Sequence, residues 1–395
     1  MRKLLAPAII IFALVLTGCK KEIRTNNPTQ LSEISASAKK PGLSAADLKA
    51  KLKKLVSSLP PGSDQRLIEK SSLLLKQHPQ YREIIRNVLA VTPTPCDANT
   101  LVSQWLDEQL ADWDSDIITL AVVTGMLDFP TYDALLFENS PENQYFGTNG
   151  QYTQIVNKTF KDLNRFWDID SDGIIVVGLH GTMLQDRERV IRIDQILFGD
   201  DRATAEFWAD LILDLLAAVP QYRNGNHPIF SFNAFAQPSF AFPPYGTIPD
   251  KIVMGDGIMD AYSAIGFGDV APQAILAHEY AHHIQFQLDL FAGDPSAEAT
   301  RRTELMADAF AAYYLSHARG ASMQWKRVKQ FLQVFLNIGD CAFTSTNHHG
   351  TPTQRMAAAE WGYSVADNAQ KQGHILSAEE FVALFDAQLP YIVTL

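Results

Sequence analysis

The sequence predicts an α+β fold that is predominantly helical and contains a small sheet. Most apolar residues recur at three- and four-residue spacing, the period of a helix with one buried face. In residues 152–167 that face carries Ile155, Val156, Phe160, Leu163 and Phe166. Only three short stretches have the character of strands, namely 174–179, 228–235 and 251–255. With 395 residues, the chain is long enough for a small all-α unit followed by an α+β body.

The N-terminus has the pattern of an export signal. A basic start, Arg2-Lys3, precedes an apolar run over residues 4–16 that is too short for a comfortable membrane span. The run ends in small residues before Cys19, which resembles a bacterial lipoprotein signal. We therefore expect removal of residues 1–18 and acylation of Cys19, so that lipid anchors an exported protein in the cell envelope. The alternative is an ordinary secretory signal or a short anchor.

The rest of the N-terminal region divides into a tether and a helical unit. Residues 19–43 are polar and lack apolar periodicity, which predicts a flexible tether. Helical patterns then follow one another, and they predict an all-α unit over residues 44–125; they cover residues 44–59, 64–77, 79–90 and 98–113. Residues 126–395 form the second predicted domain, in which 129–150, rich in Asn, Gly, Pro and Tyr, is expected to be a surface connection.

The second domain contains half of a calcium-binding pattern. Asp168, Asp170 and Asp172 alternate ahead of Gly173, as in the first half of an EF-hand loop. The twelfth position is Leu179, whereas a complete loop has a bidentate Glu there. Calcium binding and a simple polar turn both remain open.

The pattern with the clearest chemistry is His278-Glu279-Tyr280-Ala281-His282. Residues at i and i+4 of a helix lie on one face, about 5–6 Å apart, so both imidazoles can reach one tetrahedral zinc ion. Glu279 then lies beside the ion and acts on a water molecule without being a ligand. Apolar neighbours on both sides predict a buried helix, with Pro272 in its first turn.

A second helical stretch supplies the third ligand. Glu304 and Asp308 are again spaced i and i+4, in a segment that is otherwise almost entirely apolar. Two His and one Glu leave a fourth coordination position open, which is the arrangement of catalytic zinc. Asp308 is placed to accept a ring N–H from a ligand histidine and to fix its tautomer.

Together these segments resemble the bacterial neutral zinc metallopeptidases, within the wider group of gluzincins. The resemblance rests on 276–285, 304–311, Ile338-Gly339-Asp340 and 349–355, and covers about residues 250–363. It implies a zincin-like body with His278, His282 and Glu304 as ligands, Glu279 as general base and Asp308 behind the ligands. It also implies that strand 251–255 lies at a sheet edge, where it pairs with an extended peptide substrate. Ala281, where that family often has Gly, departs from the pattern.

One further catalytic group is expected at the start of the helix after His349. His349 or Arg355 can donate to the oxyanion of a tetrahedral intermediate; gluzincins give this role to a His or Tyr, which favours His349, with Tyr313 and Tyr314 as other candidates. The competing interpretation is that His349 caps a turn and Arg355 ties helices together. Cys96 and Cys341 either form a disulfide or stay free.

The function expected from these patterns is zinc-dependent hydrolysis of peptide bonds. The alternatives are a zinc-binding envelope lipoprotein that acts as a non-catalytic scaffold, and a zinc amidase that acts on cell-wall peptides. A net charge of −11 and the lack of a phosphate loop or basic aromatic patch exclude nucleotides and nucleic acids as expected partners. The oligomeric state is not indicated.

Overall fold

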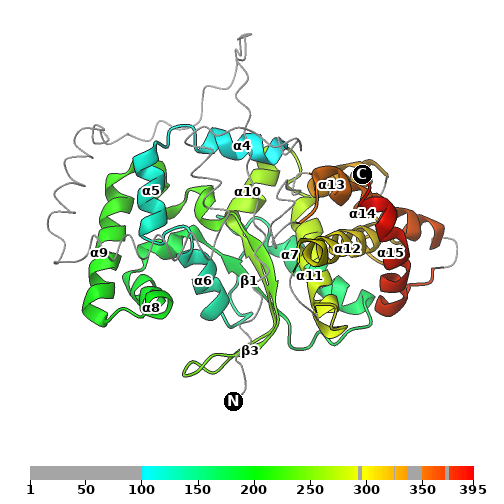
Figure 1. Ribbon diagram of the computed structural model, residues 1–395, viewed down its shortest axis with the longest axis horizontal. Coiled ribbons are helices and arrows are strands. Elements are labelled where there is room, and N and C mark those ends of the chain that lie inside the picture. The colour runs from blue at the N-terminus through cyan, green and yellow to red at the C-terminus, as the bar shows by residue number, and fades with distance from the viewer. Residues whose placement is uncertain (1–99, 292–295, 324, 337–348, 370–372) are drawn as a thin grey trace, which may run out of the picture.

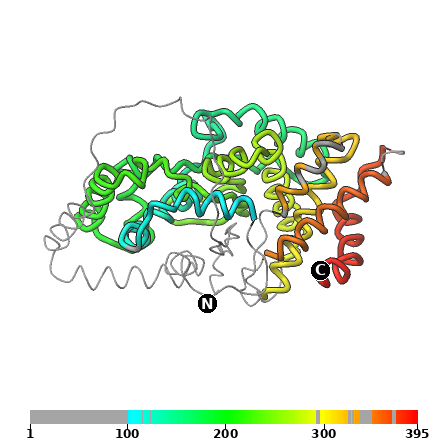
Figure 2. Tube along the Cα trace, turned by 90° about the horizontal axis from the view of Figure 1, so that it is seen from above, coloured from blue at the N-terminus to red at the C-terminus, as the bar shows by residue number. Residues whose placement is uncertain are grey.

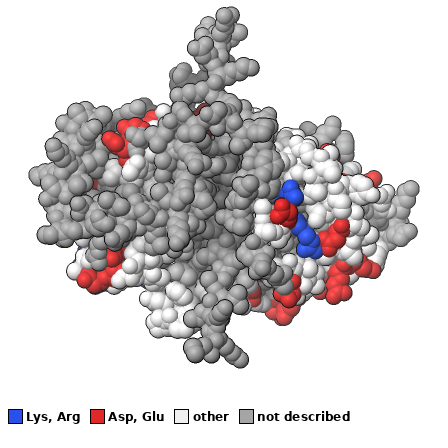
Figure 3. All heavy atoms as spheres, viewed as in Figure 1, with Lys and Arg blue, Asp and Glu red and all other residues white. Residues whose placement is uncertain are grey.

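The computed structural model describes residues 100–291, 296–323, 325–336, 349–369 and 373–395. The predictions for residues 1–99, including the signal, Cys19, the tether and the first helices, lie outside this part, as do Cys96 and Cys341. Among the described residues, no helix combines the length and apolar character needed to cross a bilayer. On the face drawn in Figure 3, the described surface carries separate groups of acidic side chains and few basic ones.

A three-stranded mixed sheet lies at the centre of the molecule (Figure 1). Its strands are β1 (Ile175–Leu179), β5 (Lys251–Gly255) and β2 (Ala234–Gln237), in the order β1-β5-β2. β5 runs parallel to β1 and antiparallel to β2. The described chain is otherwise mostly helical, apart from the short hairpin of β3 (Phe240–Ala241) and β4 (Thr247–Ile248), so the predominantly helical fold class is confirmed.

Two expectations about the strands are wrong. β5 is the central strand and is paired on both sides, so it is not an edge that can accept a peptide. The stretch 228–235 begins as a 3₁₀ turn, η3 (Pro228–Ser231), and its strand starts only at Ala234. Pro228 explains this difference, because its fixed φ suits a first helical turn and it has no N–H to give to a sheet.

Helices cover both faces of the sheet, and their apolar side chains form separate cores. Figure 2 shows the two groups at opposite ends of an elongated molecule. The helices of the first group are α5 (Ser115–Val123), α6 (Phe129–Leu136), α8 (Arg187–Phe198) and α9 (Arg202–Ala218). Those of the second are α7 (Thr153–Phe166), α11 (Ala271–Gln287), α12 (Ala297–Ser316), α13 (Trp325–Leu336), α14 (Pro352–Ala369) and α15 (Ala378–Ile392). Alternate strand residues point to opposite faces of the sheet: Ile252 and Met254 belong to the core of the second group, whereas Val253 belongs to a third, smaller apolar cluster on the other face.

The region before residue 126 is helical where it is described. α4 (Leu101–Gln109) is shorter than the predicted helix over 98–113 and is capped by Thr100. α5 shares its apolar cluster with α8 and α9, so Ile117 and Leu215 lie in one core. The proposed domain boundary near residue 125 stays a prediction, since most of the N-terminal unit lies outside the described residues.

The segment 129–150 is not simply a surface connection. It begins with α6, whose Phe129, Pro130 and Leu135 are buried. Pro130 occupies the first turn, where its missing N–H costs nothing. The carbonyl groups that follow are bound by the buried ammonium group of Lys251, which lies 3.0 Å from the oxygen of Ala134 and 2.8 Å from that of Leu135. This tertiary contact, which local sequence does not reveal, holds the end of α6 against the sheet.

α12 and α14 approach each other closely at Gly362. A Cβ atom at that position would lie 2.2 Å from the carbonyl oxygen of Ala309. Because Ala309 directly follows Asp308, and α14 also carries Arg355, this contact sets the spacing of the two helices that carry those side chains.

Gly362→Ala is therefore expected to destabilise the protein by about 1–3 kcal/mol, because the added methyl group forces the helices apart. Ala is intrinsically favoured over Gly in helices by about 1 kcal/mol, so a loss of stability isolates the tertiary clash. Urea unfolding followed by circular dichroism measures the effect. Asn368→Ala, at an exposed position of the same helix, is the control and is expected to change stability by less than about 0.5 kcal/mol. An equally stable Gly362→Ala variant would contradict the close packing.

Candidate metal centre

The candidate centre lies between α11 and α12, which pack against each other. α11 is buried on all sides over Ala274–Gln285, because the sheet covers part of it and other helices cover the rest. Its sequence favours a helix: Pro272 occupies the first turn, Ala recurs, and no Gly interrupts. α12 is capped by Ser296 and is buried from Thr303 to Ser316.

The three predicted ligands meet in space. The Nε2 atoms of His278 and His282 lie 3.1 Å apart. Glu304 Oε2 lies 3.3 Å from Nε2 of His278, and its Oε1 lies 3.5 Å from Nε2 of His282. Each side chain is at most 1% exposed. Among the described residues, these three form the one group of three or more His, Cys, Asp or Glu whose potential ligand atoms all lie within 4.8 Å of one another. This group could hold a metal ion.

Hydrogen bonds orient both imidazoles for metal binding. Nδ1 of His278 lies 2.9 Å from Asp308 Oδ1, and Nδ1 of His282 lies 2.8 Å from Gln285 Oε1. Both partners are acceptors, so each Nδ1 carries a proton and Nε2 is the nitrogen left to face the ion. Gln285 is itself fixed, since its amide donates to the carbonyl oxygen of Thr303 at 2.7 Å. The donor set therefore fits a divalent metal that accepts nitrogen and oxygen ligands.

Arg355 balances the buried negative charge. Its guanidinium donates two hydrogen bonds of 2.7 Å to the carboxylate of Asp308 and lies 3.4 Å from Glu304 Oε2. The Arg355 side chain comes from α14 and is fully buried. Although burial would raise the pKa of Glu304, the neighbouring His349, His282 and His278 hold it well below its usual range. The ligand carboxylate is thus ionised and ready to bind a cation.

The pKa values of His278 and His282 are shifted in opposite directions. Burial would lower the pKa of His278, but its hydrogen bonds to Asp308 and Glu304 raise it to about 9. Burial lowers the pKa of His282 to about 4. At neutral pH the metal-free protein therefore carries a proton on His278 between the ring and Glu304, where a metal would otherwise bind.

Glu279 lies beside the three potential ligands but is not one of them. It is 1% exposed, and its Oε1 accepts no hydrogen bond from any described residue. Burial raises the pKa of its carboxyl group to about 8. A divalent cation between His278 and His282 would lower that pKa and favour the carboxylate. The unsatisfied oxygen is the group that a water molecule could contact.

His349 belongs to the same cluster. It is 3% exposed, and its Nδ1 lies 3.1 Å from Glu304 Oε2. Its predicted contribution to oxyanion binding stays a prediction. The other candidates for that role lie elsewhere: the Tyr313 hydroxyl accepts a hydrogen bond from the Leu376 amide, and Tyr314 packs on Phe166.

The Asp168–Asp172 loop does not form a comparable cluster. Asp168 Oδ1 accepts a hydrogen bond from the Ala378 amide, and Asp170 Oδ1 accepts one from the Asp172 amide. These contacts are typical of a polar turn, and one of them binds the first residue of α15. They give no support to the calcium site.

Two residues that complete the centre were not predicted as site residues. Gln285 follows His282 by three positions on one helix, so helical spacing alone could have found it. For Arg355 the sequence offers two roles, a donor to the oxyanion and a tie between helices. Arg355 does tie helices together, through Asp308 and Glu304, and this connection depends on how α14 packs on α12.

No family model, curated protein or solved structure matches this chain. The resemblance to gluzincins stays a prediction, and the centre is described by its own geometry.

Arg355→Met is expected to lower the unfolding free energy of the metal-free protein by about 3–5 kcal/mol, because it removes the buried guanidinium that makes two hydrogen bonds to Asp308 and lies beside Glu304. Arg302→Met is the matched control. Arg302 makes two 2.8 Å hydrogen bonds with Asp386 near the surface, and its loss should cost at most about 1 kcal/mol. Urea titration of both variants measures the difference; equal losses would refute the compensating role.

Metal binding is expected to release protons. His278 has a raised pKa, so at pH 7 it is protonated in the metal-free protein, and the metal must displace that proton. In Glu279→Gln, where the neighbouring carboxyl group cannot titrate, about one proton should leave and affinity should rise about tenfold per pH unit up to about pH 9. Calorimetry in buffers of different ionisation enthalpy counts the protons. Binding that depends on neither buffer nor pH would contradict this charge state.

Proposed function

We propose that this protein is a zinc-dependent metallopeptidase that hydrolyses peptide bonds in a peptide or protein substrate. The observation that carries the proposal is the convergence of His278, His282 and Glu304 with the unsatisfied carboxyl oxygen of Glu279 beside them. Two His and one Glu are the ligands of catalytic zinc sites, which keep a fourth position open, whereas structural sites usually use Cys. Helices packed beside a small mixed sheet are consistent with a zincin-like body.

Each residue of the centre has a separate role in the proposed hydrolysis. Bound zinc supplies Lewis acidity, which polarises the scissile carbonyl and makes water a stronger acid. Glu279 takes a proton from the attacking water and passes it to the leaving nitrogen as the C–N bond breaks. Asp308 and Gln285 hold the two imidazoles in position, and Arg355 holds the Asp308 carboxylate through two hydrogen bonds. His349 donates to the oxygen on which negative charge develops.

The buried Glu279 favours an enzyme over a non-catalytic scaffold. A carboxyl oxygen without a hydrogen-bond partner, such as Oε1 of Glu279, costs stability when it is buried, and a site that only held a metal would gain nothing from it. A zinc amidase that acts on cell-wall peptides would use the same chemistry. Only the substrate that the protein cleaves distinguishes this alternative from a general peptidase. We propose that the protein acts in the bacterial cell envelope, anchored by lipid on Cys19, as its first residues predict.

Glu279→Gln is expected to bind zinc with wild-type stoichiometry and to lose at least about a hundredfold in activity, because it keeps the ligands but removes the base. His278→Ala should lose both zinc and activity. Equilibrium dialysis with metal analysis, together with cleavage of casein and of cell-wall peptide fragments with and without chelator, distinguishes the candidate functions.

His283→Gln is the matched control for the histidine variants. His283 is the neighbour of a ligand and equally buried, but its Nε2 lies 3.0 Å from the carbonyl oxygen of Lys251 and its ring faces the sheet. This variant should keep its zinc. A fully active Glu279→Gln protein would rule out the proposed base, and zinc binding without hydrolysis of any substrate would favour the scaffold.

A further inference from the structure

A second cluster of polar side chains lies at the carboxyl edge of the sheet, on elements other than α11 and α12. His180 directly follows β1, and Asp256 directly follows β5. Because β1 and β5 are parallel, these residues meet at the same edge, where His180 Nδ1 lies 2.7 Å from Asp256 Oδ2. Ligands of open sheets with parallel strands commonly bind outside this edge.

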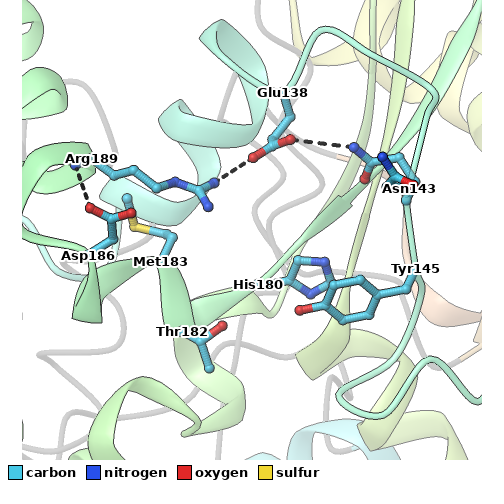
Figure 4. Close-up of a pocket in the computed structure, with 9 residues that line it drawn as sticks. Glu138, Asn143, Tyr145, His180, Thr182, Met183, Asp186 and Arg189 are labelled. Carbon is cyan, nitrogen blue, oxygen red and sulfur yellow. Dashed lines mark hydrogen bonds and ion pairs between the residues drawn. The ribbon is translucent and has the colours of Figure 1, made fainter.

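A pocket of about 200 Å³ lies beside this pair (Figure 4). The segment 138–145, the 3₁₀ turn η1 (Gly181–Gln185) and the start of α8 provide its walls. Pockets for drug-sized ligands usually measure about 300–1,000 Å³, so this pocket suits a smaller molecule.

An aromatic platform forms part of the wall. The ring of Tyr145 stacks on the ring of His180, with centroids 4.0 Å apart and planes inclined by 10° (Figure 4). The hydrogen bond between His180 Nδ1 and Asp256 also holds the His180 ring, so the platform is fixed before a ligand binds. Tyr145 nevertheless remains 41% exposed.

Strand β1 makes room for this platform. A Cβ atom at Gly178 would lie 2.5 Å from Nε2 of His180 and 2.7 Å from the carbonyl oxygen of Tyr145. The Gly178 amide also donates to Gln144 Oε1 at 2.8 Å, which holds the segment that carries Tyr145. Glycine is unfavourable inside a strand and often marks the close approach of another group. Here it accommodates both stacked residues.

The charged side chains that line the pocket already have partners within the protein. Arg189 lies 2.6 Å from Glu138 Oε1 and also binds Asp133. Asp186 Oδ1 caps α8 by accepting hydrogen bonds from two backbone amides, and Asp256 is paired with His180. A phosphate would therefore meet an arginine that is already shared by two carboxylates. A cation would meet Glu138, which already binds Arg189, and Asp186, which already accepts two backbone N–H groups. This balance favours a neutral ligand.

The uncharged polar side chains of the lining include Asn143, Thr182 and Tyr145. Amides and hydroxyls can both donate and accept hydrogen bonds, as the hydroxyl groups of a ligand do. Stacked aromatic rings beside such groups match a small ring that has an apolar face and hydroxyls around its rim. We propose that this pocket binds one neutral sugar ring, which packs on Tyr145 and bonds to Asn143 and Thr182.

Titration of the full chain with the methyl glycosides of glucose, galactose, mannose and N-acetylglucosamine tests this proposal by calorimetry and saturation-transfer NMR. At least one glycoside should bind with a millimolar Kd. Tyr145→Ala should weaken binding about tenfold, whereas Tyr145→Phe, which keeps the ring, should stay within about threefold of the wild type. Tyr391→Ala, at a 69% exposed position on α15, is the control and should bind like the wild type.

Thr182→Val provides a second variant in case Tyr145→Ala misfolds; it removes a hydroxyl with little change of shape and should weaken binding about fivefold. The pocket uses neither the metal nor Glu279, so binding should persist with chelator and in Glu279→Gln, whatever becomes of the peptidase proposal. The proposal is overturned if none of the four glycosides binds at millimolar concentration, if folded Tyr145→Ala and Thr182→Val both bind like the wild type, or if inorganic phosphate or lysine methyl ester competes with the sugar.

Discussion

The structure depends on the compensation of two carboxylates that have almost no access to water. Glu304 and Asp308 project from one face of α12 into a region closed by α11 and α14. Taking such charges out of water costs several kcal/mol each unless opposite charges and hydrogen bonds meet them. Arg355 provides the fixed positive charge, and the protonated His278 ring directs Nδ1 towards Asp308 and Nε2 towards Glu304.

The same contacts explain how the surrounding helices are placed. The hydrogen bonds of Arg355 require α14 to approach α12 closely, and Gly362 permits that approach two turns further along α14. On the other side of α11, His283 contacts the carbonyl oxygen of Lys251, so the same helix is held against the central strand. The contacts of Arg355, Gly362 and His283 thus position α11, α12 and α14 relative to one another and to β5. They hold the imidazoles of His278 and His282 in place before an ion binds.

Local spacing was sufficient to predict which side chains meet at the candidate metal centre. His278, His282, Glu304 and Asp308 lie at intervals that helical geometry converts directly into shared faces, and the structure brings all four together. Strands β1 and β5 also followed from short β-branched runs. Properties that depend on tertiary packing could not be predicted in this way. The central place of β5 depends on β2, the helix at 129–136 depends on a distant lysine, and the binding of Arg355 to Asp308 depends on how α14 crosses α12.

The central claim is that one divalent ion is held by two imidazoles and a carboxylate. X-ray absorption spectroscopy of the zinc-loaded protein tests it most directly, because the spectrum reports the number and kind of ligands. The account predicts one zinc per chain in a four-coordinate site, with two imidazole nitrogens at about 2.0–2.1 Å and the remaining ligands oxygen. Sulfur in the coordination shell, or a six-coordinate ion surrounded only by oxygen, would contradict it.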